Sequence, residues 1–383
     1  MNKKLMAVAV AGALAAPAAA LAQTTIYGVF NAEYGVASQP NTSANAARHD
    51  AEGFNSGASR IGLRGEEKLG GGLAAWYQCE SQLNVFPGPS SAGSISAAAS
   101  SSSTASVWCG RNSAIGMKGG FGNFYVGTWD SPIKRASGVS RITNETGWLG
   151  TQHILLEPSQ VADFSDRPSN TLNYDSPNLG GFTISLQATS LQTTFNATTG
   201  TVAEGRKLGL GGQYATGPIA VAAAIEKRDE NCAAATGCST SAGTLTSDDS
   251  SAWLVGATYV FGPVKLGLTY TDMETKIAGT TVERTAWNIA GEWKISGPGL
   301  IRFGYALADD LEGTVKVPSS GAKQYQISYL HNFSKRTQGY LGYVKLDNDS
   351  AGTYNLSGLS AGAANVFPGD SADAVAVGLS HTF

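Results

Sequence analysis

The sequence predicts an all-β chain that folds as a 16-stranded antiparallel transmembrane β-barrel. Three observations predict this fold. Apolar residues alternate with small or polar ones at a period of two, the period of a strand with two different faces. Strands of about ten residues are joined alternately by tight turns and long polar loops, as they are in membrane barrels. The chain also opens with a segment typical of exported proteins.

The alternation is clearest over residues 286–295. Trp287, Ile289, Trp293 and Ile295 share one parity with a glycine, whereas residues of the other parity are small, polar or charged. The same pattern recurs at 264–271, 300–307 and 324–333. A soluble β-sandwich would show the same alternation, so the lengths of the connections between strands must distinguish a sandwich from a membrane barrel.

Seven tight turns and eight long polar segments connect the expected strands. The turns are expected near 69–71, 119–120, 178–180, 216–217, 262–263, 296–299 and 334–336. The long segments are expected at 36–57, 84–106, 129–166, 192–204, 229–249, 276–281, 310–320 and 348–371. The strands between them number 16, a size at which a barrel encloses an aqueous channel. They are expected at 25–36, 58–68, 72–83, 107–118, 121–129, 167–175, 181–191, 205–215, 218–227, 250–261, 264–274, 281–295, 300–307, 322–333, 338–346 and 372–383.

The first 22 residues are predicted to be a secretory signal peptide, with the barrel spanning 23–383. Lys3 and Lys4 give a positive start, an apolar run follows, and Ala20-Leu21-Ala22 supplies a small-x-small cleavage pattern. A membrane-anchoring helix is the alternative. It would need about 20 apolar residues, and Pro17 interrupts this run.

The charge balance argues against a nucleic-acid partner. Cleavage would lower the 26 basic residues to 24 against 29 acidic ones, a net charge of −5. A nucleic-acid-binding surface would be basic.

The four cysteines favour disulfides, because an exported chain with an even count usually pairs them. Cys232 and Cys238 would close a small loop, and Cys79 could meet Cys109 across a hairpin. No Cys-x-x-Cys motif or neighbouring histidine points to a zinc or redox site.

No catalytic residue, cofactor site or metal site is predicted. The four histidines are scattered without metal-ligand spacing. Ser360 lies in a Gly-x-Ser-x-Gly pattern, yet it sits in a Gly/Ser/Ala-rich segment without the strand-to-helix context of a nucleophile elbow.

Ordered motifs span the chain from residue 25 to its last residue. They read TIYGV at 25–29, SRIGLRGEEKLGGGL at 59–73, GRNSAIGM at 110–117, RPSNTLNY at 167–174, NLGGF at 178–182, YLHNFSKRT at 329–337 and GLSHTF at 378–383. Together they resemble the Gram-negative trimeric porin family, in its β-proteobacterial general porin type.

The resemblance implies a multi-pass outer-membrane porin whose water-filled channel passes small hydrophilic solutes and ions by passive diffusion. It implies a homotrimer surrounded by outer-membrane lipid and lipopolysaccharide. It also implies that the third long loop, 129–166, folds inward and narrows the pore. By motif position the pore-lining cations are Arg60, Arg111 and Arg167, and parity alone adds Arg64 and Arg302. The candidate acids on the facing loop are Asp130, Glu145, Glu157 and Asp163.

One departure from the family pattern concerns selectivity. Such porins carry Gly-Arg-Gln after the fifth strand, where this chain has Gly127-Thr128-Trp129 and so lacks one pore cation. We therefore predict only a weak anion preference. Two other classes stay open on the sequence alone, namely an outer-membrane barrel hydrolase and a secreted soluble β-rich binding protein.

Overall fold

The computed structural model describes residues 24–39, 49–86, 108–143, 147–157, 161–190, 192–196, 201–231, 239–240, 243–244, 247–277, 279–356 and 368–383. The predicted signal peptide lies outside these residues, as do Glu145, Ser360 and the pair Cys232 and Cys238. No helix of the described part is both long enough and apolar enough to cross a bilayer.

The regular structure of the described chain is strand, apart from two short helices, α2 and α3. The first half contains β1 (Thr25–Gln39), β2 (His49–Asn55), β3 (Arg60–Gly70), β4 (Leu73–Gln82), β5 (Ser113–Gly119), β6 (Gly122–Thr128), α2 (Pro132–Ser140), α3 (Gln152–Leu155), β7 (Thr171–Asp175), β8 (Phe182–Thr189), β9 (Gln192–Asn196) and β10 (Thr201–Thr216). The second half contains β11 (Ile219–Asn231), β12 (Ser239–Thr240), β13 (Gly243–Thr244), β14 (Ser247–Phe261), β15 (Val264–Ile277), β16 (Thr280–Lys294), β17 (Gly299–Ala308), β18 (Glu312–Gly313), β19 (Ala322–Asn332), β20 (Thr337–Asn348) and β21 (Ser371–Thr382).

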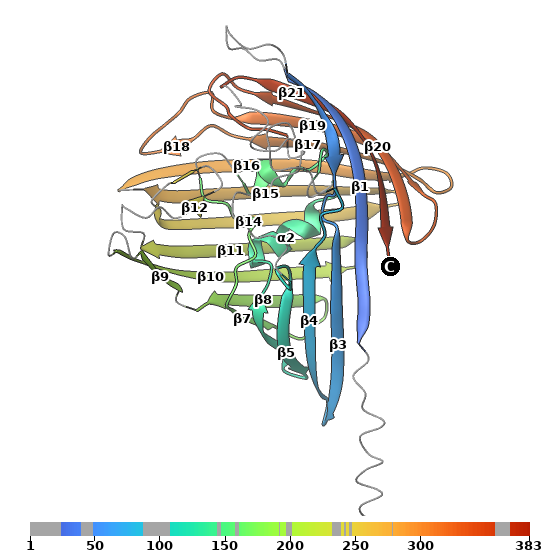
Figure 1. Ribbon diagram of the computed structural model, residues 1–383, viewed down its shortest axis with the longest axis vertical. Helices are drawn as coiled ribbons and strands as arrows, with labels where there is room; N and C mark the ends of the chain where they lie inside the picture. Colours follow the sequence, from blue (N-terminus) through green and yellow to red (C-terminus); the bar gives the residue numbers. More distant parts are fainter. Residues whose placement is uncertain are drawn as a thin grey trace, which may run out of the picture.

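The sheet closes into the predicted antiparallel barrel of 16 strands. Three of the barrel strands are split: β2 and β3 both pair with β1, β8 and β9 with β10, and β17 and β18 with β16. Closure comes from β1, which pairs antiparallel with β21 from Val29↔Thr382 to Ser38↔Asp373. Figure 1 shows β1 lying beside β20 and β21, with α2 inside the curve of the sheet.

The period-two pattern explains why the sheet closes as a barrel. On β16, Trp287 and Ile289 point outward and are 40% and 53% exposed, whereas Ala286, Asn288 and Ala290 point inward and are fully buried. The apolar outer face suits lipid, and closure leaves no unpaired strand edge within the bilayer.

Two predicted strands begin later than expected. The fourth was expected from residue 107 and starts at Ser113, and the sixth was expected from residue 167 and starts at Thr171. Before the sixth strand, Pro168 lacks a backbone N–H and Asn170 has a φ of +55°, so neither can extend the ladder. Arg111 and Arg167 therefore precede their strands instead of lying within them.

Several segments expected as loops are strands instead. The end of β1 and β2 occupy half of 36–57, and β9 with the start of β10 occupies much of 192–204. The segment 276–281 is a tight hairpin between β15 and β16. Their sequences lack strong alternation because strand ends that rise above the membrane need no apolar face.

The third long loop lies inside the barrel, as expected. Its residues rest on inward-facing glycines, at each of which an added Cβ would come within 3.3 Å of the loop. Trp148 lies on Gly35, Leu149 on Gly342, Thr143 on Gly304, Ser140 on Gly256 and Gly267, and Pro132 on Gly209 and Gly211. We call these seven residues the glycine track. It runs along β10, β14, β15, β17, β20 and β1, and so carries the loop around much of the inner wall.

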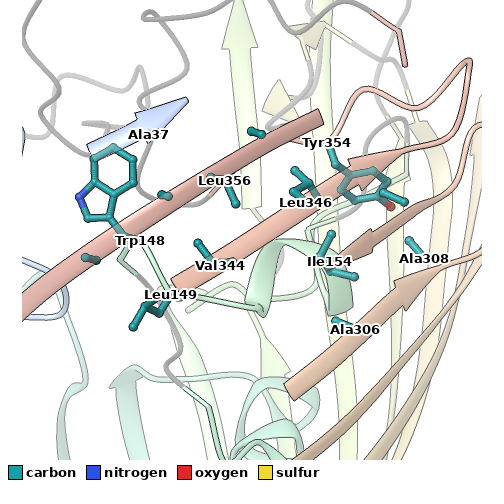
Figure 2. Packing of buried hydrophobic residues seen from close by; sticks show 14 residues of the cluster. Ala37, Trp148, Leu149, Ile154, Ala306, Ala308, Val344, Leu346, Tyr354 and Leu356 are labelled. Carbon is teal, nitrogen blue, oxygen red and sulfur yellow. The ribbon is translucent and has the colours of Figure 1, made fainter. Parts of the chain in front are cut away.

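Two small hydrophobic cores fill the space between the inward loops and the wall. In the first, Trp148, Leu149 and Ile154 pack against alanines and leucines of β17 to β21, together with Tyr354 and Leu356 (Figure 2). In the second, Ile133, Leu155, Leu156 and Phe164 pack against Ala222, Ala224, Leu254 and Met273. Together the two cores cover the inner wall on β1, β11, β14 to β17 and β19 to β21.

Candidate pore constriction

Glu80 is the centre of the charged group on the β3–β5 wall. The Nε atom of Arg111 lies 2.7 Å from its Oε1, and the Nε atom of Arg60 lies 3.5 Å from its Oε2. The hydroxyl of Tyr27 donates to the same carboxylate at 3.1 Å. Arg111 also donates to the side chain of Gln82 at 2.6 Å. One acid thus holds two arginines side by side against the wall.

A break in the second barrel strand positions Arg60 at about mid-height. Between β2 and β3 the chain leaves the ladder, and the hydroxyl of Ser59 replaces the lost pairing by accepting from the Asn31 N–H at 2.8 Å. Arg60 is the first residue after this break, paired with Val29 on β1, and its guanidinium donates to the Ala58 carbonyl at 3.0 Å.

Arg167 forms a second group beside the first. Its Nη2 lies 2.8 Å from Oδ1 of Asp130, and its Nε donates to Oδ1 of Asn112 at 2.6 Å. Asn112 in turn donates to Asp130 at 2.8 Å and directly follows Arg111 in the chain. The arginines of the predicted set that flank β5 therefore belong to one continuous network.

The two cations assigned by parity lie in different places. Arg64 points into the lumen from β3 and covers the Tyr27 ring at 5.0 Å, so it joins the wall group. Arg302 lies on β17, where its Nε is 2.8 Å from Glu292 of β16. It is therefore on another wall and apart from the other arginines.

The candidate acids of the loop do not form a row facing the arginines. Asp130 pairs with Arg167 on the arginine side. Glu157 accepts from Gln152 and Ser165 within the loop itself, and Asp163 accepts from the Ser165 N–H at 2.6 Å. Glu145 lies outside the described residues.

Sequence reasoning missed two cations on α2 and a third directly after it. Lys134 lies 3.7 Å from Asp130, Arg135 lies 2.9 Å from Asp175, and Arg141 follows the helix and donates to Ser137. A usable signal was present, because Ser131 followed by Pro132 is a helix start and the Ser131 hydroxyl does cap α2. A helix there places charged side chains inside the barrel.

A buried charge cluster fastens the end of the loop to the wall. Arg228 of β11 lies 2.8 Å from Glu226 and 3.3 Å from Asp166, and Lys207 of β10 also pairs with Asp166. The guanidinium covers the Phe164 ring at 4.2 Å. Arg228 and Glu226 are almost fully buried, so each charge depends on its partners.

The docking of this segment should depend on pH. Burial and the neighbouring Glu157 raise the pKa of Asp163 to about 6. A raised carboxyl pKa stabilises docking fully below the undocked value of 3.8, and this stabilisation is lost as pH rises through about 6. Hydrogen exchange of 161–166, corrected for its intrinsic rate, should therefore show less protection at pH 8 than at pH 5. Asp163→Asn should abolish the difference, and an unchanged difference in that variant would contradict the assignment.

The predicted disulfide between Cys79 and Cys109 is present. It joins β4 to the segment before β5, with the two Cα atoms 4.6 Å apart. The bridge expected between Cys232 and Cys238 lies outside the described residues. Within the described ranges no group of three or more His, Cys, Asp and Glu could hold a metal ion.

A closed barrel with an apolar exterior and a narrowed, charged lumen defines an outer-membrane porin. The profile of the Gram-negative porin family matches residues 7–351, and the chain belongs to that family. The outer membrane porin protein 32 of Delftia acidovorans is 28% identical over 395 residues, covering 100% of both chains.

Solved structures agree with this fold. The anion-selective porin from Comamonas acidovorans superposes with a TM-score of 0.69 at 24% identity, covering 94% of this chain and 100% of that one. OmpT of Vibrio cholerae in its trimer form superposes with a TM-score of 0.63 at 14% identity, covering 94% and 99%. The chain is thus a channel protein of the outer membrane through which small solutes diffuse, rather than an enzyme or a soluble binding protein.

Proposed function

We propose that the channel has a weak anion preference set by the arginines beside β5. Arg60 and Arg111 pair with Glu80, Arg167 and Lys134 pair with Asp130, and Arg64 covers the Tyr27 ring, so these contacts hold five cations and two acids. This excess of cations is the observation that supports the proposal. Arginine stays protonated throughout the pH range of a living cell, so the excess is permanent.

The sign of the preference follows from distance and screening. The net negative charge of the chain is spread over a large surface, where salt screens it beyond about 8 Å. Salt screens charges enclosed in a narrow lumen much less than charges on an outer surface. The local excess of positive charge should therefore outweigh the distant negative charge, although Glu80 and Asp130 neutralise part of the positive charge.

Arg111→Ser tests the role of this group. The variant leaves Glu80 with one arginine instead of two, so the reversal potential in a KCl gradient should move toward cations. Loss of one charge at several ångströms should lower the anion-to-cation permeability ratio roughly threefold. Arg336→Ser, in an exposed turn outside the pore, is the matched control and should leave the ratio unchanged. An equal shift in both variants would contradict the assignment.

The channel should discriminate uncharged sugars by size alone. Liposome swelling should be fast with monosaccharides and slow with trisaccharides, because the inward loop leaves only part of the lumen open. Equal rates for both would mean that the loop does not narrow the path.

We further infer a homotrimer embedded in lipid and lipopolysaccharide. Outward aromatic residues support both contacts: Phe30 stacks on the terminal Phe383 at 5.6 Å beside the β1–β21 seam. Elsewhere on the outer face, Trp253 of β14 contacts Tyr270 of β15, and Tyr305 of β17 contacts Tyr325 of β19, as in an aromatic girdle at a membrane interface. Light scattering in mild detergent should give the trimer mass, and a monomer mass would refute the homotrimer.

The mature chain should begin at Gln23, because the signal peptide is expected to end at residue 22. N-terminal sequencing of the purified protein checks this start.

A further inference from the structure

A small pocket lies beside α2 on the side of the short turns, below the constriction. It has a cavity volume of about 160 Å³ and is bounded by α2, the end of β7, β8, β10 and β11. Its lining combines polar and apolar residues. Arg135, Asp175, Thr183, Ser185 and Gln213 contribute side chains to it.

An ion pair with both partners accessible forms one side of the pocket. The Nη1 of Arg135 lies 2.9 Å from Oδ1 of Asp175, and their side chains are 35% and 25% exposed. The Tyr125 hydroxyl donates to Oδ2 of Asp175 at 3.2 Å. Among the described residues Arg135 makes its hydrogen bonds through Nη1 alone, so its Nε and Nη2 donors are left for a ligand.

The other side of the pocket has unused hydrogen-bonding capacity. The side chains of Thr183, Ser185 and Gln213 make no hydrogen bond with any described residue. The Ser185 hydroxyl lies directly over Gly211, whose missing Cβ would fall 2.6 Å from it. Two hydroxyls and an amide can both donate and accept, and the glycine leaves room for the Ser185 hydroxyl at the wall of the pocket.

We propose that this pocket is a solute subsite for small zwitterions of the α-amino acid type. The α-carboxylate would bind the free donors of Arg135, the α-ammonium would bind Asp175, and a short side chain would face Thr183 and Ser185. A simple anion gains less, because the adjacent Asp175 repels it, and a simple cation is repelled by Arg135. Only a solute that carries both charges meets both partners favourably. This proposal rests on the proposed diffusion function, and it adds that zwitterions bind transiently at this pocket as they pass through the channel.

Single-channel recording with alanine tests the proposal. Alanine added on the side of the short turns should cause transient, saturable reductions of the KCl current. Lactate lacks the ammonium and alaninol lacks the carboxylate, so each should be at least about tenfold weaker, the loss expected for one charged contact of about 1.4 kcal/mol or more. Equal potency of the three compounds would overturn the proposal.

Variants separate binding from structural support. Asp175→Asn and Arg135→Gln should each abolish the alanine effect, and the milder Thr183→Val, which leaves the ion pair intact, should weaken it severalfold. Glu66→Gln is the matched control, since Glu66 and Lys118 form a similarly accessible pair, 2.6 Å apart, in the same half of the lumen. An unchanged alanine effect in Asp175→Asn, or the same loss in Glu66→Gln, would refute the subsite. Normal KCl conductance without any alanine effect would refute the subsite while leaving the diffusion function intact.

Discussion

Replacing Gly35 with alanine should release the tip of the inward loop and widen the channel. A Cβ at this position would lie 2.3 Å from the Trp148 indole, which is fully buried against β1. The indole cannot move deeper because the wall of the barrel lies behind it. Trp148 must therefore leave its site, together with the backbone N–H that donates to Glu33 at 2.5 Å.

The expected effect is large because Trp148 is the largest fully buried side chain of the loop. Removing a buried tryptophan from its packing costs about 3–5 kcal/mol, enough to make the undocked loop the main population. Single-channel conductance should rise, and trisaccharides should enter liposomes at nearly the rate of monosaccharides. Gly138→Ala is the control, because it makes the same change on α2 with open space around it. Unaltered conductance in Gly35→Ala would show that the tip is not docked at this site.

Replacing Arg228 with methionine should destabilise the other end of the loop. The change leaves the carboxylate of Glu226 buried without its partner and removes one of the two cations on Asp166. Removing one partner of a buried ion pair typically costs about 3–5 kcal/mol. We expect residues 161–166 to lose hydrogen-exchange protection and the open-channel current to become noisy, while the barrel strands keep their protection.

A double variant distinguishes charge from packing. Glu226→Gln combined with Arg228→Met removes both buried charges and leaves Lys207 to pair with Asp166. Most of the lost protection should return, because no uncompensated charge remains. If the double variant is as unprotected as the single one, the loss comes from the contact between Arg228 and Phe164 rather than from charge.

The barrel could be predicted because lipid imposes the same demand on every strand. Each strand needs an apolar outer face, so the sequence pattern alone predicts that a residue such as Ile289 points outward. The ends of strands that lie outside the lipid do not need an apolar outer face. β2 therefore lacks the alternating pattern. β7 starts later than its pattern predicts because Pro168 and Asn170 have backbone geometries that do not fit a strand.

The interior of the pore was less predictable because its contacts join distant strands. Glu80 meets Arg60 across the β3–β4 ladder and Arg111 across a long loop, and neither neighbour is visible from the sequence around it. The glycine track has the same origin. Gly35 and Gly342 receive adjacent residues of the loop although they lie on β1 and β20, and only the closed barrel brings them together. The disulfide between Cys79 and Cys109 could be predicted from the sequence, because the two cysteines were expected to meet across a hairpin.

The reversal potential of the native trimer in a KCl gradient is the most direct test of a water-filled pore governed by its arginines. At low salt the account predicts a stable ohmic current with a potential that favours chloride, and a preference that weakens as salt is raised, since screening acts on the arginines. A potential that favours potassium at low salt would contradict it, and would assign control of the pore to acidic groups instead of the arginines around Glu80.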